Sequence, residues 1–169
     1  MIIARASRRR CRAFSLIELL VVLAIVSLMA SLTAPSLLEQ VQSWRLRTLA
    51  LQLVSAIWLA RATALRSGQK IVLCPLTDNR CGGLYQEGFG VFSGEGTLLH
   101  QYPSRSGVSV TNRIGSRPES QAVVWNEAGL GSRNATFLFC AKNTQTNWAV
   151  VLNRVGRPRL RQDWGICPS

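Results

Sequence analysis

One acidic residue, Glu18, lies inside an otherwise apolar stretch near the start of the sequence. The stretch reads FSLIE over residues 14–18 and stays apolar through residue 34, directly after an arginine-rich segment. A carboxylate in a membrane-length segment costs roughly 2–3 kcal/mol or more, so such acids are candidates for function. The chemistry open to Glu18 is pairing with a positive group, which a segment that leaves the bilayer to join a partner would need.

A second group of candidate residues is a basic run near residue 160. Its arginines are Arg154, Arg157, Arg159 and Arg161. In extended backbone the last three would project from one face. Pro158 cannot donate to a strand ladder and favours an edge position, and Gly156 would let the backbone approach a ligand closely. Guanidinium groups in a row suit phosphates, so double-stranded DNA is a candidate partner.

Two other interpretations of these side chains stay open. Arginines on an edge strand also protect against aggregation or contact another subunit. Trp148 and Trp164 could offer stacking surfaces near the arginines, or could equally be packing residues of the core.

Catalytic chemistry is not indicated. His100 is the single histidine and lies in a strand-like run, and paired carboxylates, phosphate-binding loops and metal motifs are missing from the sequence. We therefore expect no enzyme activity, no cofactor and no metal.

The elements that carry these residues are one long helix and many short strands. Apolar residues recur at three- and four-residue spacing up to about residue 66; they are Leu46, Leu49, Leu53, Ile57, Ala60 and Ala64. Gly68 is placed to end the helix in a left-handed cap. Strands are predicted at 70–74, 88–92, 97–101, 108–111, 121–125, 136–140, 148–152 and 158–161. This predicts an α+β fold, with a long N-terminal helix packed on a small antiparallel sheet pair or sandwich.

The N-terminal sequence RAFSLIELLVVLAIVSLMASLTAPS resembles type IV pilins and type II secretion pseudopilins. The resemblance implies that a prepilin peptidase cuts between Ala13 and Phe14 and methylates Phe14, and that Glu18 pairs with the N-terminal amine of a neighbouring subunit. The usual residue before the cut is Gly, and Ala13 departs from it. A plain anchor, or a secretory signal cleaved after Ala34, is the alternative interpretation.

This cut would change both the charge and the cysteine count. Residues 1–13 contain five of the 20 basic residues and none of the 8 acidic ones, so a chain starting at Phe14 keeps a net charge of +7. Cys11 would also be lost, which leaves Cys74, Cys81, Cys140 and Cys167. An even set in an exported domain predicts two disulfides. Three connectivities are open, of which we favour Cys74–Cys81 and Cys140–Cys167; a zinc site is the competing interpretation.

The rest of the sequence resembles the branch of this family that includes type II secretion protein H pseudopilins and the minor pilins FimT and FimU. The matching runs are ARATALRSGQKIVLCP, GFGVF, ATFLFC and VGRPR. The resemblance implies a 1–13 leader, a 14–38 transmembrane helix, a 39–67 continuation and a 68–169 periplasmic head. The implied partners are other pilins or pseudopilins, the peptidase and the inner membrane. The Gly-Arg-x-Arg pattern resembles a DNA-contacting motif proposed for FimT-type pilins.

Overall fold

The computed structural model describes residues 15–103, 106–142 and 144–168, apart from the side chains of residues 32–36. The chain divides into two compact units, Met1–Leu38 and Glu39–Ser169. Both contain part of one helix, α1 (Leu16–Ser67), which agrees with the helix predicted from residue 14 to about residue 66.

In the first unit, α1 begins just after Ser15, whose carbonyl accepts hydrogen bonds from the backbone N–H groups of Glu18 and Leu19 at 3.1 and 3.2 Å. The side chains of residues 16–31 are exposed. The hydroxyls of Ser27 and Ser31 donate to backbone carbonyls of the same helix at 2.9 and 2.7 Å. The helix surface is therefore apolar, and its two serines are satisfied internally, as a lipid environment requires.

Among the described residues, one helical segment, Leu37–Ser67, is long and apolar enough to cross a membrane, and Leu16–Ser31 is apolar but shorter than a full span. Length and hydropathy do not decide whether Leu37–Ser67 crosses a membrane, because the core helix of a folded domain has the same properties. Much of Leu37–Ser67 is such a core helix.

The second unit is built around the Glu39–Ser67 part of α1. The six residues of the predicted apolar face are buried, five of them completely and Leu49 to 7% exposure. The helix ends as predicted at Gly68, whose φ of +61° and N–H bond to the Ala64 carbonyl at 3.0 Å form a left-handed cap.

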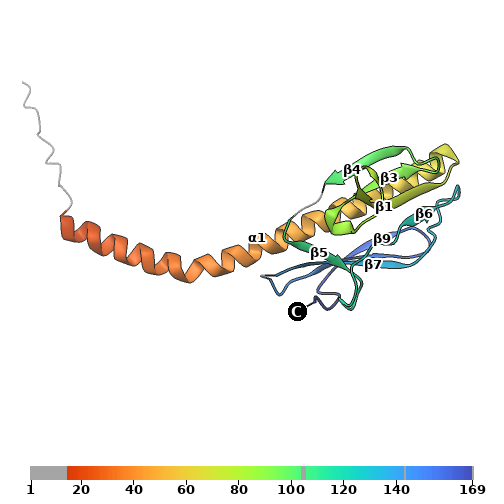
Figure 1. The fold of residues 1–169 in the computed structure, drawn as a ribbon. Coiled ribbons are helices and arrows are strands. Elements are labelled where there is room, and N and C mark those ends of the chain that lie inside the picture. Colours follow the sequence, from red (N-terminus) through yellow and green to blue (C-terminus); the bar gives the residue numbers. More distant parts are fainter. Residues whose placement is uncertain (1–14, 104–105, 143, 169) are drawn as a thin grey trace, which may run out of the picture. The chain divides into compact units, whose positions relative to one another are not determined.

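Two antiparallel sheets pack against this part of the helix (Figure 1). The first has the order β2 (Arg80–Cys81), β1 (Ile71–Thr77), β3 (Gly88–Ser93) and β4 (Leu98–Pro103), with β6 (Val123–Trp125) also paired to β1. The second has the order β5 (Val108–Thr111), β7 (Ala135–Ala141), β8 (Trp148–Leu152) and β9 (Pro158–Gln162). The predicted α+β class with a long helix on antiparallel sheets is confirmed.

One hydrophobic core joins α1 to both sheets, and Trp125 and Phe137 are its largest fully buried side chains. A short 3₁₀ helix, η1 (Tyr85–Glu87), adds the buried Tyr85 to this core. The phenol donates toward the carbonyls of Leu73 and Gln121, both at 3.2 Å. Burial raises the pKa of Tyr85, so the phenol stays neutral and connects β1 to the segment before β6.

The largest difference from the predicted strands is at the end of β1. The sequence predicted a strand ending at Cys74 and a turn over residues 75–80, whereas β1 continues to Thr77 and pairs with β2. The turn is only Asp78-Asn79, both with positive φ (51° and 61°). Asp and Asn tolerate this conformation, so a two-residue hairpin forms where a longer loop was expected.

Candidate functional site

The N-terminal candidates lie at the edge of the described structure. Ala13 and Phe14, the predicted cleavage and methylation residues, lie outside the described residues. Glu18 is exposed in the first turn of α1. A carboxylate there interacts favourably with the positive end of the helix dipole. Among the described residues it makes no salt bridge.

The C-terminal arginines lie on and just before β9, at the edge of the second sheet. Arg159 pairs with Val151 and Arg161 with Ala149, while Leu160 between them packs on the core. Strand alternation therefore places Arg159 and Arg161 on the face away from the helix. Both are exposed.

Arg154 and Arg157 belong to the tight turn between β8 and β9. The amide oxygen of Asn153 accepts the N–H of Arg157 at 3.0 Å, and that of Asn134 accepts the N–H of Arg154 at 2.8 Å. These bonds hold the backbone and leave both guanidinium groups exposed. Arg154 also lines a shallow hollow together with Lys70.

Gly156 differs from the expectation. It is buried, its φ is +76°, and a Cβ there would lie 2.7 Å from the indole nitrogen of Trp125 and 2.9 Å from the Gly129 carbonyl. Its missing side chain lets the turn pack against the protein's own core. The close approach expected with a ligand is therefore made with Trp125, and Gly156 shapes the turn that presents the arginines.

The two tryptophans are in different environments. Trp148 is half-buried on the core side, and its indole N–H lies 3.4 Å from the Ser43 hydroxyl. Trp164 is 41% exposed, and the guanidinium carbons of Arg113 and Arg161 lie 4.8 and 5.7 Å from its ring centroid. Trp148 is thus a packing residue, whereas Trp164 belongs to the exposed arginine surface.

The sequence reasoning missed Arg113, which lies just after β5 and far from the basic run in sequence. Its carbonyl accepts the N–H of Ile166 at 3.1 Å, so the backbone itself brings the two segments together. We use the name arginine edge for the exposed side chains that lie along β9 and at its two ends. They are Arg113, Arg154, Arg157, Arg159, Arg161 and Trp164.

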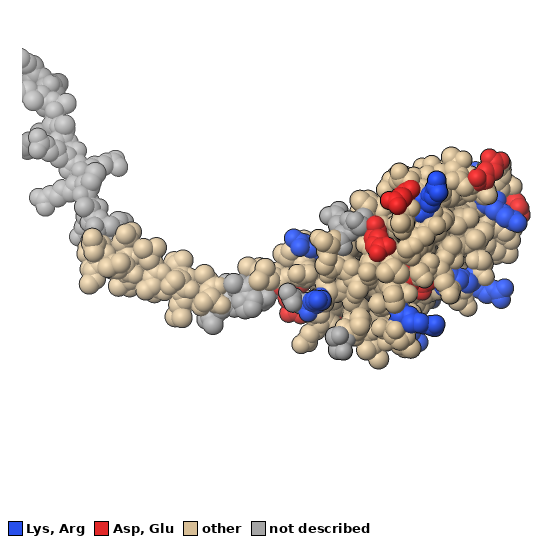
Figure 2. All heavy atoms as spheres, in the orientation of Figure 1, with Lys and Arg blue, Asp and Glu red and all other residues tan. Residues whose placement is uncertain are grey.

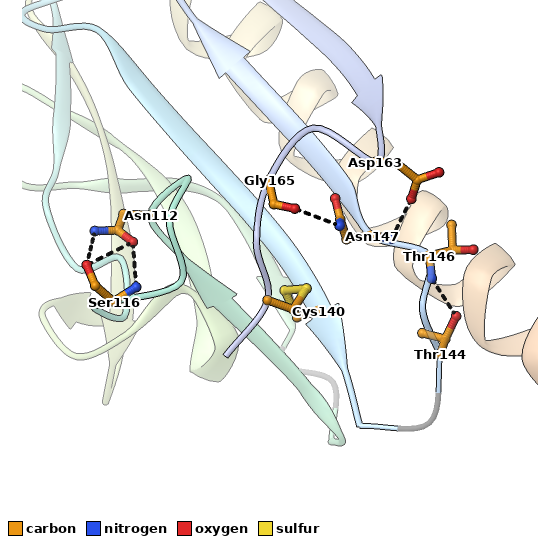
Figure 3. Close-up of a disulfide and its surroundings, with 9 residues drawn as sticks. Asn112, Ser116, Cys140, Thr144, Thr146, Asn147, Asp163 and Gly165 are labelled. Carbon is orange, nitrogen blue, oxygen red and sulfur yellow. Dashed lines mark hydrogen bonds between the residues drawn. A yellow bond between two sulfur atoms is a disulfide. The ribbon is translucent and has the colours of Figure 1, made fainter. Parts of the chain in front are cut away.

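The tail that carries Trp164 is fixed at several points (Figure 3). The disulfide Cys140–Cys167 attaches it to β7. Asn147 is buried, and its side-chain amide donates to the Gly165 carbonyl at 3.1 Å, while its backbone N–H donates to the Asp163 carboxylate at 3.1 Å. The second favoured disulfide, Cys74–Cys81, is also present and closes the β1–β2 hairpin. In the described part of the chain, no cluster of potential metal ligands accompanies them.

None of the arginines of the arginine edge forms a salt bridge within the described residues. The salt bridge that the described residues do contain joins Arg133 to Glu119 at 2.7 Å, and neither residue belongs to the arginine edge. Lysine and arginine side chains also occur elsewhere on the visible face of the head (Figure 2), so basic charge is not confined to one site. What distinguishes the edge is five exposed arginines along and beside one edge strand, two of which approach an exposed indole.

An apolar helix that starts with an exposed glutamate and continues into a two-sheet, disulfide-bonded head defines a pilin-like subunit. The sequence matches the family model described as "Type II transport protein GspH" over residues 49–156 and the "Prokaryotic N-terminal methylation motif" over residues 8–34. The chain belongs to the GspH family of minor pilins and pseudopilins, as its resemblance to that branch suggested.

Solved structures support the fold. The minor pilin FimU of the type IV system of Pseudomonas aeruginosa PAO1 has a TM-score of 0.53 at 16% identity, with 69% of this chain and 88% of FimU covered. The minor pseudopilin EpsH of the type 2 secretion system of Vibrio cholerae has a TM-score of 0.51 at 15% identity, covering 69% and 95%. A search of curated proteins gave no significant match.

Proposed function

We propose that this chain is a minor type IV pilin, inserted in the bacterial inner membrane with its head in the periplasm, that primes or caps the pilus and has no enzymatic role. The family match and the exposed Glu18 in an apolar helix support this proposal. The leader of residues 1–13 is removed by prepilin peptidase, Phe14 is methylated, and Glu18 pairs with the Phe14 amine of the neighbouring subunit. Residues 14–38 then serve in turn as membrane anchor and as part of the fibre core.

The test is a deletion of the gene, complemented by the native chain or by Glu18→Ala. We expect the deletion to reduce surface fibres, the native chain to restore them, and Glu18→Ala to be processed and present in the membrane without restoring them. Glu18→Gln is the matched control for side-chain size. Restoration by the alanine variant would reject the assembly role of Glu18.

The second candidate is a minor pseudopilin of type II secretion, for which the similarity of EpsH is the supporting observation. The same deletion strain separates the two. Loss of fibres with normal export of secreted enzymes supports the role as a minor pilin. Normal fibres with loss of enzyme export support the role as a minor pseudopilin of type II secretion.

We further propose that the arginine edge binds double-stranded DNA for uptake. One observation carries this: five exposed arginines, free of salt bridges among the described residues, lie along β9 and at its two ends, and two of them approach the exposed ring of Trp164. Arginines of this kind hold phosphates without reading base sequence. Binding is therefore sequence-independent and falls steeply with salt.

The experiment is a gel-shift titration with the head unit from Glu39 onward. Arg157→Gln with Arg159→Gln should weaken retention of DNA and flatten the log–log salt dependence by about two units, because two phosphate contacts are lost. Arg66→Gln with Arg80→Gln removes the same charge elsewhere on the head and is the matched control. Equal retention by both pairs would rule out the arginine edge as the DNA site.

A further inference from the structure

The head part of α1 carries a second row of apolar side chains that stay largely exposed beside the sheets, although Ser55 of this row lies 3.4 Å from the Tyr102 hydroxyl of β4. Large side chains recur there every seven residues, each between 46% and 68% exposed: Trp44, Leu51, Trp58 and Leu65. Small residues stand four positions after the first three: Thr48, Ser55 and Ala62. Seven-residue spacing with alternating steps of four and three is the spacing of a coiled-coil seam, here with large apolar side chains at one position and small side chains at the other. We call this face the heptad stripe.

The stripe is separate from the core face of the same helix. At 100° per residue, the buried residues Leu46, Leu53 and Ala60 lie about opposite Leu51 and Trp58. The helix therefore has two apolar faces, and the sheets account for one of them. Exposed apolar side chains in a continuous row mark an interaction surface.

The polar atoms on the stripe do not oppose burial. The Thr48 hydroxyl donates to the Trp44 carbonyl at 2.9 Å, and the Ser55 hydroxyl to the Gln52 carbonyl at 2.8 Å. Because both donors are satisfied within the helix, covering them leaves no hydroxyl proton unpaired. The small residues also leave gaps into which side chains of a second helix fit.

The charges beside the stripe indicate what kind of helix would pack against it. With Trp44, Leu51, Trp58 and Leu65 as d positions, the four arginines of this part of the helix fall at e and g positions: Arg45, Arg47, Arg61 and Arg66. The single acidic residue between 39 and 67 is Glu39, before the stripe begins. Charges at e and g set partner choice in coiled coils. Two copies would bring arginines together, which disfavours self-pairing.

We propose that the heptad stripe packs against a helix of a different subunit, one that carries apolar a and d residues and acidic e and g residues. The inference rests on the proposed function only in making that subunit a neighbour in the fibre. It adds what the neighbour must look like, and it disfavours a second copy of this chain as the occupant.

The test uses the full chain in lipid nanodiscs, with p-benzoylphenylalanine in place of Leu51 as a photo-crosslinker. The probes are two synthetic helices of about 28 residues, four heptads, with leucine at a and d and either glutamate or lysine at e and g. Leu99 of β4 has the same 46% exposure as Leu51 and is the matched control position.

We expect the glutamate helix to be crosslinked from position 51 about tenfold more than the lysine helix, less at high salt, and neither from position 99. Equal yields with the two helices, crosslinks between two copies of the chain, or crosslinks to lipid alone would each overturn the proposal. A lipid-only result would identify the stripe as a membrane-facing surface.

A second experiment, in cells, tests the heptad stripe separately from the proposed role of the protein in the fibre. Leu51→Gln with Trp58→Gln changes residues outside the buried core, and thermal unfolding of the head is measured to show that the variant still folds. We expect the variant to be lost from purified fibres. If it enters fibres like the native chain, the stripe is not an interface, although the role of the protein in the fibre stands. If deleting the gene leaves both fibres and secretion unchanged, the proposed function itself fails.

Discussion

The guanidinium group of Arg113 lies over the ring of Trp164, with its carbon 4.8 Å from the ring centroid. The two residues come from different loops of the second sheet, and Arg161 approaches the same ring at 5.7 Å. Cation–π contacts of this kind hold side chains in place without neutralising their charge. The pair therefore orders the arginine edge and keeps it basic.

This arrangement predicts that Arg113 contributes to DNA retention although it lies outside the basic run. Arg113→Gln should weaken DNA binding by the head and reduce the salt slope by about one unit, as for one phosphate contact. Trp164→Ala should weaken binding at all salt concentrations with little change of slope, because the ring that positions Arg113 and Arg161 is lost and no charge is removed. A gel-shift series from low to moderate salt measures both. An unchanged Arg113→Gln titration would remove this residue from the site.

The two disulfides should contribute unequally to stability. Cys140–Cys167 closes a separation of 27 residues and Cys74–Cys81 one of 7. Loop-closure entropy then predicts losses of roughly 3–4 and about 2 kcal/mol when each pair is replaced by serine. Urea unfolding of the head measures both. Only the loss of Cys140–Cys167 should also reduce DNA retention, because it releases the tail that carries Trp164.

Processing should depend on the residue before the cut. Ala13→Gly restores the residue usual in the family and should speed cleavage by prepilin peptidase. A large charged residue, as in Ala13→Arg, should block it. Mass spectrometry of the isolated chain should show N-methylated Phe14 as its first residue. Equal cleavage of all three chains would mean that this position does not matter to the peptidase.

Gly156→Ala should destabilise the head while leaving every charge in place. The left-handed φ and the short distance from an added Cβ to Trp125 predict a loss of about 1–3 kcal/mol. Thermal unfolding followed by tryptophan fluorescence measures this. Gly96 also has positive φ but open space around it, so Gly96→Ala is the control. It should lose only the stability that alanine costs in a left-handed backbone conformation. Equal losses would mean that the contact with Trp125 is unimportant.

Stability should fall at alkaline pH because of Tyr85. Burial raises the pKa of Tyr85 above that of the unfolded chain, about 10. A buried phenol that resists ionisation contributes its full stability below that pH, and the contribution declines as the pH rises above it. Tyr85→Phe should cost about 1–2 kcal/mol at neutral pH through the lost hydrogen bonds and lose less on going to pH 11. Parallel pH dependences of the two proteins would contradict this.

Local signals were enough for the elements of the fold. The spacing of Leu46, Leu53 and Ile57 identified the core face of α1, and Gly68 its end. Most strand positions followed from short β-prone runs between turn residues. The β1–β2 hairpin was missed because Asp78-Asn79 can adopt left-handed conformations that are more usual for glycine.

The candidate site was only partly accessible from the sequence. The basic run was visible as spacing, but the position of Arg113 beside Trp164 depends on long-range pairing of β5 with β7 and on the disulfide that returns the tail. The position of Gly156 against Trp125 depends on tertiary packing in the same way. No local pattern contains either contact.

The two apolar faces of the Leu37–Ser67 segment have a consequence for biogenesis. Hydropathy alone does not distinguish this segment from a membrane anchor, and only the sheets remove its core face from competition with lipid. A chain interrupted before β3 would offer the export machinery a second stop-transfer sequence. If the proposed anchor is right, we expect chains truncated shortly after Ser67 to keep the Leu37–Ser67 segment in the membrane as well.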